Sequence, residues 1–247
     1  MGKRIVALFS VLILLFSAVI WRLSWLSRKE DFAQAANQQS TYTLEVSQSR
    51  GMIYDCQGQS LVNDSFHYMA AVLPNNESAA ALRSQFASAD LWREKMNSRV
   101  PFLTEVNTDA VRGEGVEVFS VPDRYSMDYT APHIVGYVDA DGVGQTGIER
   151  IFNDFLKSVG EKVKVRYQID AMGRALSGNG IEILQEGNRS DGVVLTLHKG
   201  LQQACERILS GAEVNGAIVV MDLADGGLRA VASAPGFDPR NVAESMN

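Results

Sequence analysis

An unbroken apolar run near the N-terminus constrains this chain more than any other feature. Residues 5–26 are apolar apart from Ser10, Ser17, Arg22 and Ser24. As a helix rising about 1.5 Å per residue, the run would reach roughly 33 Å, which is enough to cross the hydrocarbon core of a bilayer. The sequence therefore predicts a single transmembrane helix in this region.

The residues that flank this run bear on its orientation and on whether it is cleaved. Basic residues 3–4 precede it, which favours a cytoplasmic N-terminus, although basic residues 28–29 place positive charge on the far side as well. A cleaved signal peptide is the alternative, but bulky Trp21 and Arg22 follow the apolar core where a cleavage site requires small residues. We expect an uncleaved, single-pass anchor in the cell membrane, with the bulk of the chain extracytoplasmic.

The charge of the chain is unevenly distributed and excludes some partners. Residues 1–29 hold five basic side chains and no acidic one, so the remainder carries 18 basic and 29 acidic side chains. A basic end suits an anionic membrane surface. An acidic body argues against nucleic-acid binding, which requires a basic face.

The sequence offers little support for metal or disulfide sites. Cys56 and Cys205 are far apart and show no metal-ligand spacing, so we expect two thiols, with a single disulfide between them left open. The three histidines are scattered without an H-x-x-x-H spacing. No metal or other cofactor is predicted.

One glycine-rich stretch matches a nucleotide-binding motif. Residues 142–147 read G-x-G-x-x-G, follow an apolar stretch at 134–138 that we interpret as a strand, and precede a helical stripe at 148–159. Asp170 lies at the distance expected for a ribose ligand. The stretch follows a membrane anchor, however, and no repeated βαβ series surrounds it. A glycine-rich turn is the preferred interpretation, and a dinucleotide-binding oxidoreductase is the least favoured function.

Hydrophobic periodicity predicts an α+β body beyond the anchor. Alternating or short apolar runs indicate strands, a period of 3.6 residues indicates helices, and D-G-G at residues 225–227 indicates a hairpin. The expected strands are at 42–46, 66–73, 116–118, 163–169, 193–197, 216–223 and 228–232, and the expected helices at 77–99 and 201–209.

The sequence R-G-M-I-Y-D at residues 50–55 stands where the anchor region gives way to the folded body. Gly51 permits backbone conformations that other residues disfavour, residues 52–54 are expected to be extended, and residues 55–58 to form a turn that reverses the chain. Taken alone, this pattern predicts an ordinary strand and turn.

Several stretches together resemble the N-terminal half of the class B penicillin-binding proteins. R-G-M-I-Y-D with Gly58 and Leu61 is similar to the family motif R-G-x-I-x-D-R-N-G-x-x-L, although Cys56 and Gln57 replace its usual Arg-Asn. Further stretches resemble family motifs in the same order. Arg124-Tyr125 followed by A-P-H-I-V-G-Y-V at 131–138 resembles R-x-Y…A-H-x-x-G-Y-V, and 144–152 resembles G-x-x-G-[IL]-E-x-x-[FY]. Residues 170–176 resemble D-A-x-G-R-x-L, and residues 191–209 and 216–239 resemble the start of the transpeptidase domain.

The resemblance implies an α+β architecture in three parts. Residues 1–29 would form a cytoplasmic tail and transmembrane anchor, and residues 30–188 an elongated pedestal, or dimerisation, domain of mixed structure. Residues 189–247 would form the incomplete start of an α/β penicillin-binding transpeptidase domain. We expect this last part to be poorly packed or prone to aggregation in the isolated chain, because its strands have unpaired edges.

The resemblance also implies a function. Intact family members bind penicillin and cross-link peptidoglycan through a serine activated by a lysine in an S-x-x-K motif, with a later K-T-G. Neither motif occurs in these 247 residues, so the chain is predicted to be non-catalytic. Its expected work is anchoring, positioning of the transpeptidase and docking onto protein partners of the bacterial cell-wall machinery. A homodimer is left open, and a stand-alone extracytoplasmic binding module is the alternative.

The residues expected to matter are structural. We expect Arg50 and Asp55 to pair or hydrogen-bond within the pedestal, Glu149 to suit the positive end of a helix, and Gly51 and Gly147 to serve the backbone. The full set of predicted motif residues is Arg50, Gly51, Asp55, Gly58, Gly136, Gly147, Glu149, Asp170, Gly173 and Arg174.

Overall fold

The structure is a computed structural model that describes residues 2–27, 41–85, 89–98, 100–170, 181–212 and 215–242. The chain divides into two compact units. One comprises Met1–Tyr42 and Tyr167–Gly180, and the other comprises Thr43–Arg166 and Ile181–Asn247. The predicted motif residues Gly173 and Arg174 lie outside the described residues.

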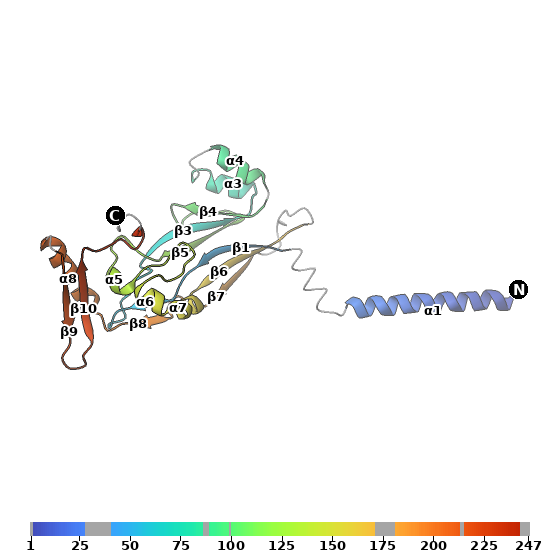
Figure 1. Cartoon of the computed structure of the whole chain (residues 1–247). Helices are drawn as coiled ribbons and strands as arrows, with labels where there is room; N and C mark the ends of the chain where they lie inside the picture. Colours follow the sequence, from blue (N-terminus) through green and yellow to red (C-terminus); the bar gives the residue numbers. More distant parts are fainter. Residues whose placement is uncertain are drawn as a thin grey trace. The chain divides into compact units, whose positions relative to one another are not determined.

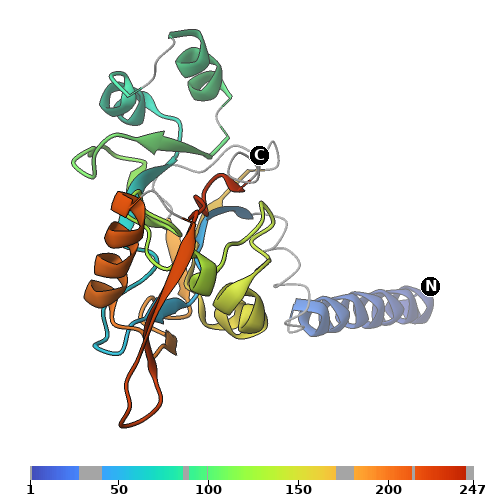
Figure 2. The ribbon, with the colours of Figure 1, turned by 60° about the vertical axis from the view of Figure 1, so that its left-hand side comes forward.

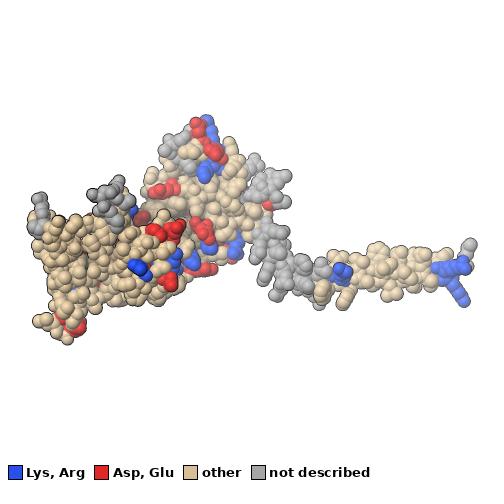
Figure 3. Space-filling view, in the orientation of Figure 1, with Lys and Arg blue, Asp and Glu red and all other residues tan. Residues whose placement is uncertain are grey.

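The first unit contains the long N-terminal helix α1 (Gly2–Ser27). By length and composition, its Gly2–Trp25 portion could cross a membrane. Large apolar side chains such as Leu14 and Trp21 are about three-quarters exposed on it, at 70% and 73%. Figure 3 shows basic side chains gathered towards its ends and none along its middle. A helix that is apolar all round needs apolar surroundings.

The second unit contains a three-stranded antiparallel sheet and two short helices (Figure 1). Strand β3 (Ser65–Val72) lies between β4 (Phe102–Val106) and β5 (Val116–Asp123), and α3 (Asn76–Leu82) and α4 (Ala89–Asn97) separate β3 from β4 along the chain. The sequence predicted β3, the helices and β5, but not β4. The apolar core of this sheet and its helices consists of Ala70, Val72, Leu82, Phe102, Val106, Val111 and Val116.

A second sheet has the strand order β1-β6-β7. Strands β1 (Thr41–Gln48) and β6 (Lys162–Gln168) were predicted from their alternating apolar residues, and in β6 this alternation buries Val163 and Val165. Strand β7 (Glu182–Glu186) pairs antiparallel with β6.

The last part of the chain forms a helix against a hairpin (Figure 2). Helix α8 (Lys199–Ala212) packs on β9 (Gly216–Met221) and β10 (Leu228–Ala234), which pair antiparallel. Cys205, Leu209, Ala230 and Ala232 form the core of this layer. Ile208, although apolar, is 62% exposed on this helix.

Two sequence-based predictions for residues 131–159 are wrong. The strand expected at 134–138 is replaced by α5 (Pro132–Val135), where proline occupies the first helical position and its fixed φ suits a helix start. The single helix expected at 148–159 is divided into α6 (Gly147–Ile151) and α7 (Asn153–Val159), because Phe152 adopts φ −104° and ψ 22°.

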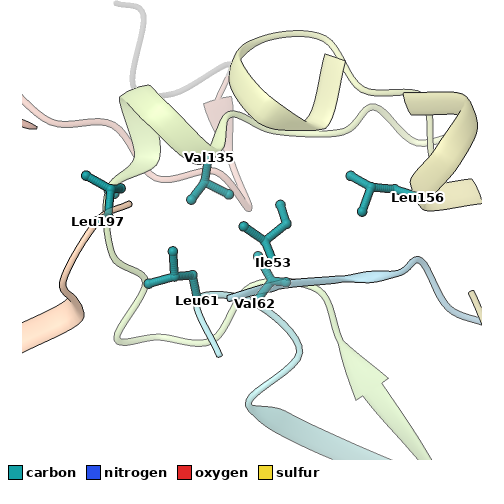
Figure 4. Close-up of a cluster of buried hydrophobic side chains, with 7 residues drawn as sticks. Ile53, Leu61, Val62, Val135, Leu156 and Leu197 are labelled. Atoms are coloured by element: carbon teal, nitrogen blue, oxygen red, sulfur yellow. The ribbon is translucent and has the colours of Figure 1, made fainter. Parts of the chain in front are cut away.

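The short strands β2 (Met52–Tyr54) and β8 (Gly192–Val194) pair in parallel and join the early and late parts of this unit. Beside them lies a buried apolar cluster (Figure 4) to which the β2 region, α5, α7 and the approach to α8 all contribute. Its members are Ile53, Leu61, Val62, Ala131, Val135, Leu156 and Leu197. The R-G-M-I-Y-D stretch therefore lies at the centre of the unit.

Candidate functional site

A buried carboxylate organises the region that follows β1. Glu149, in the first turn of α6, has no exposed surface, and Arg50 reaches it from the loop before β2. The Arg50 Nε lies 3.0 Å and its Nη2 2.9 Å from Glu149 Oε2, so two nitrogens of the guanidinium group contact the same carboxylate oxygen. Arg50 also donates to the carbonyl oxygen of Gly142 and to Asn153 Oδ1.

A second arginine completes this ion network. Arg124, from the loop after β5, places its Nε and Nη2 each 2.5 Å from Glu149 Oε1, and its Nη1 donates to the carbonyl oxygen of Gly51 at 2.7 Å. The Tyr125 hydroxyl donates to the same carboxylate oxygen. Burial raises the pKa of Tyr125, and the charge of Glu149 raises it further. One carboxylate thus holds two guanidinium groups from segments 74 residues apart.

Two predicted glycines allow the backbone to approach closely beside this network. A Cβ added at Gly136, where φ is +84°, would lie 2.0 Å from the carbonyl oxygen of Thr146. At Gly147, with φ +58°, it would lie 2.3 Å from the carbonyl oxygen of Ile134. The end of α5 and the start of α6 therefore touch through backbone atoms, and this contact sets the position of Glu149.

The glycine-rich loop at 142–147 uses its backbone groups within the fold. The carbonyl oxygen of Gly142 accepts from Arg50, and the N–H of Gly144 donates to Asn153 Oδ1. A Cβ at Gly144 would lie 2.0 Å from the carbonyl oxygen of Glu149. These contacts support the interpretation of the loop as a structural turn.

The second predicted acidic residue, Asp55, is buried in the turn after β2. Its Oδ1 accepts from the backbone N–H groups of Gln57 and Gln59, each at 2.8 Å, and its Oδ2 accepts from the N–H of Lys199 at 3.0 Å. Burial alone would raise the pKa of Asp55, but these three donors favour the charged form and the net pKa is lowered. Asp55 therefore binds the first N–H of α8 and not Arg50.

Lys199 strengthens the same connection. Its ammonium group donates to the carbonyl oxygen of Ser60 at 2.7 Å and lies 3.4 Å from Asp64 Oδ2. Backbone hydrogen bonds from Cys56 N–H to the carbonyl oxygen of Leu197 and from Leu195 N–H to that of Tyr54 extend the β2–β8 pairing. The turn at 55–64 is thus tied to the start of α8.

We expect Asp55→Asn to destabilise the protein at neutral pH and to have little effect in acid. The amide would place an N–H group against the N–H of Lys199, and loss of hydrogen bonds to a charged group costs roughly 1–3 kcal/mol. Because the folded-state pKa of Asp55 is lowered from 3.8, its stabilising contribution is present above that pH and is lost as the pH falls through the lower folded-state value. Urea unfolding over a series of pH values from 7 to below 3.8 measures this; a deficit that does not shrink as the pH falls below 3.8 would contradict it.

The structure brings some predicted residues together and leaves others apart. Arg50, Gly51, Gly136, Gly147 and Glu149 meet around one ion network, and Asp55 lies at the far end of β2. Gly58 occupies the exposed turn after Asp55 with φ +77° and open space around its Cβ position, and Asp170 belongs to the other unit. Sequence reasoning missed the roles of Arg124, Asn153 and Lys199; for Arg124 the R-x-Y motif was the available signal.

The chemistry available to these groups is structural. Glu149 is fully buried and its oxygens are occupied by two arginines and a tyrosine. Within the described part of the chain, no group of three or more His, Cys, Asp or Glu side chains could hold a metal ion. Cys56 is an exposed thiol and Cys205 a buried one.

Comparison with known proteins gives this architecture its context. No family model matches the chain. The peptidoglycan D,D-transpeptidase MrdA of Escherichia coli K12 is 28% identical over 293 aligned residues, covering 99% of this chain and 45% of the relative. A probable peptidoglycan D,D-transpeptidase of Pseudomonas aeruginosa, PbpC, is 26% identical, covering 97% of this chain and 46% of the relative. The chain thus spans about half the length of the curated relatives it matches.

A solved structure extends the similarity to the fold. The chain superposes on a protein of a peptidoglycan synthase complex, described as coordinating polymerization and crosslinking, with a TM-score of 0.51 and 20% identity. The match covers 97% of this chain and 50% of that protein. The α+β fold predicted from the sequence is therefore confirmed.

Proposed function

We propose that this chain, which matches the N-terminal portion of the class B penicillin-binding proteins, serves as a membrane anchor and pedestal in peptidoglycan synthesis. Residues 1–29 would form the cytoplasmic tail and anchor, residues 30–188 the extracytoplasmic pedestal, and residues 189–247 the start of a transpeptidase domain. The pedestal would hold that domain at a fixed place outside the membrane.

One observation supports the positioning role most strongly. The segment at 50–64 follows the anchor region in sequence, and it binds the pedestal through Arg50 and Glu149 and the start of α8 through Asp55 and Lys199. Both carboxylates are fully buried. A segment fixed at both ends by buried charged contacts can define the orientation of α8 and of the hairpin packed on it, as a pedestal must.

Protein partners of the cell-wall machinery are part of the proposal. One protein of similar fold comes from a peptidoglycan synthase complex, and both curated relatives are peptidoglycan D,D-transpeptidases or probable ones. We propose that the extracytoplasmic body of this chain docks onto such a partner. A stand-alone binding module would share the anchor and body but would act without any transpeptidase.

The proposal excludes penicillin binding by the chain as it stands. Acylation requires a serine that a neighbouring base activates, and the family's S-x-x-K and K-T-G motifs do not occur in the sequence. We expect no covalent labelling when membranes that contain the chain are incubated with a fluorescent penicillin, while the E. coli relative MrdA in parallel membranes is labelled. A labelled band at 27.0 kDa, abolished by prior treatment with unlabelled penicillin, would contradict the proposal.

A further inference from the structure

Helix α5 has little to hold it in place by itself. It is four residues long, and its N-cap Ala131 adopts a left-handed conformation, φ 55° and ψ 46°, without a side-chain cap. A helix this short is not stable in isolation. The conformational entropy lost when its first turn forms outweighs the free energy gained from the few hydrogen bonds of that turn. The stability of α5 must therefore come from residues that pack against it.

A carboxylate from α8 supplies the missing cap. Glu206 Oε1 accepts a hydrogen bond from the N–H of Ala131 at 2.8 Å. The buried amide of Gln202 orients this carboxylate by donating to the same oxygen at 2.9 Å. Gln202 is itself fixed, because its amide exchanges two hydrogen bonds with the backbone of Val231 in β10, at 2.7 and 2.8 Å.

An aromatic contact holds the other end of the same segment. The ring of Phe237, in the chain that follows β10, meets the rings of His133 and Tyr137 edge to face, with centroids 5.1 and 6.0 Å apart. His133 Nε2 also donates to the carbonyl oxygen of Pro235 at 3.1 Å. Residues 130–137 are thus contacted from two sides, by Glu206 of α8 and by Phe237 of the segment after β10.

The hydrogen bonds that connect β2 and β8 are separate from these contacts. They are those of the parallel strand pairing, the hydrogen bond from Lys199 N–H to Asp55 and that from Cys56 N–H to the carbonyl oxygen of Leu197. None of these involves residues 130–137, Glu206 or Phe237. Ala131 and Val135 do share the apolar cluster with Ile53 and Leu197, but the Glu206 and Phe237 side chains contribute no hydrogen bond to the β2–β8 connection.

We infer that residues 130–137 form a latch that Glu206 and Phe237 close, and that this latch opens locally while β2 and β8 stay paired. Closing the latch fixes residues 192–240 against the pedestal, and opening it frees them to move about the β2–β8 connection. Glu206 and Phe237 are accordingly positioning residues. This inference rests on the proposed positioning role and extends it to a specific set of contacts.

Hydrogen exchange on the full chain in detergent micelles tests the latch. Local exchange rates report the free energy of local opening. We expect Phe237→Ala, and separately Glu206→Ala, to speed exchange of residues 130–137 about tenfold, the effect of losing one good aromatic or charged contact. Exchange of residues 52–54 and 192–194 should be unchanged. Phe155→Ala, which removes a ring that is 44% exposed on α7, is the matched control and should alter neither region.

Two outcomes would overturn the latch. Unchanged exchange at 130–137 in both variants would show that these side chains do not hold the segment. Equal acceleration at 130–137 and at 52–54 would show global loosening without a local opening. Should Phe237→Ala fail to fold, Phe237→Leu keeps the apolar bulk, lacks the ring edges and is judged by the same two outcomes. Because the measurement needs neither membrane topology nor a partner, its failure would leave the anchor function standing.

Discussion

Replacement of Glu149 by glutamine is expected to lower the free energy of unfolding by about 3–5 kcal/mol, which is the usual cost of breaking a buried ion pair from one side. Glutamine keeps the shape of the side chain but removes its charge. Arg50 and Arg124, whose side chains are only 8% and 12% exposed, would then be buried together without a counter-ion. Urea-induced unfolding of the full chain in detergent micelles, followed by tryptophan fluorescence or circular dichroism, measures the change.

A surface pair provides the control for this substitution. Glu182 lies 2.9 Å from Arg166 with about half of its side chain exposed, so Glu182→Gln should cost less than about 1 kcal/mol. Equal effects of Glu149→Gln and Glu182→Gln would show that the buried network does not stabilise the folded body of the chain.

Gly136→Ala is expected to destabilise the protein by about 3 kcal/mol or more, combining backbone strain with overpacking. Alanine disfavours the φ of +84° found there, and its Cβ would lie 2.0 Å from the carbonyl oxygen of Thr146. Relief of that clash would separate α5 from α6 and shift Glu149 away from its arginines. The midpoint of thermal or urea unfolding should fall accordingly.

Substitutions at two other glycines distinguish the cost of backbone strain from the cost of overpacking. Gly58 also has a positive φ, +77°, but open space around its Cβ position, so Gly58→Ala should show the strain alone, about 1–2 kcal/mol. Gly211, in α8, has open space and no positive φ, so alanine there should be neutral or stabilising. If Gly136→Ala were no worse than Gly58→Ala, the close backbone contact would not matter.

Local chemistry made part of this fold predictable from the sequence. The turn after β2, the alternation in β6 and the hairpin around residues 225–227 are encoded by neighbouring residues, and the structure contains all three. The long apolar helix α1 follows from composition alone. Such features need no information about distant parts of the chain.

The incorrect predictions share a different cause. Helix α5 depends on Glu206 and on Phe237, which are 75 and 100 or more residues away, and β4 is a short strand that pairs with β3. Likewise, we expected Arg50 and Asp55 to pair or hydrogen-bond, but the sequence could not identify their partners, because periodicity carries no information about long-range contacts. Arg50 pairs with Glu149, and Asp55 with the start of α8.

The two cysteines of the chain allow a direct measurement of its proposed topology. Cys56 is exposed in the turn after β2, whereas Cys205 is buried under the hairpin, so a thiol reagent should report on the first alone. Cys56→Ser is therefore the matched control and should abolish labelling of the folded chain. Permeabilised cells give the total labelling that is available in either orientation.

Labelling of Cys56 in intact bacterial cells with a membrane-impermeant maleimide, with the outer membrane opened where one is present, tests the central claim most directly. If α1 anchors the chain with its body outside the cytoplasm, Cys56 reacts before permeabilisation and to nearly the same extent as after it, and the labelled chain remains in the membrane fraction. If Cys56 reacts only after permeabilisation, or if the labelled chain is released in soluble form, the chain is not an extracytoplasmic pedestal held by a membrane anchor.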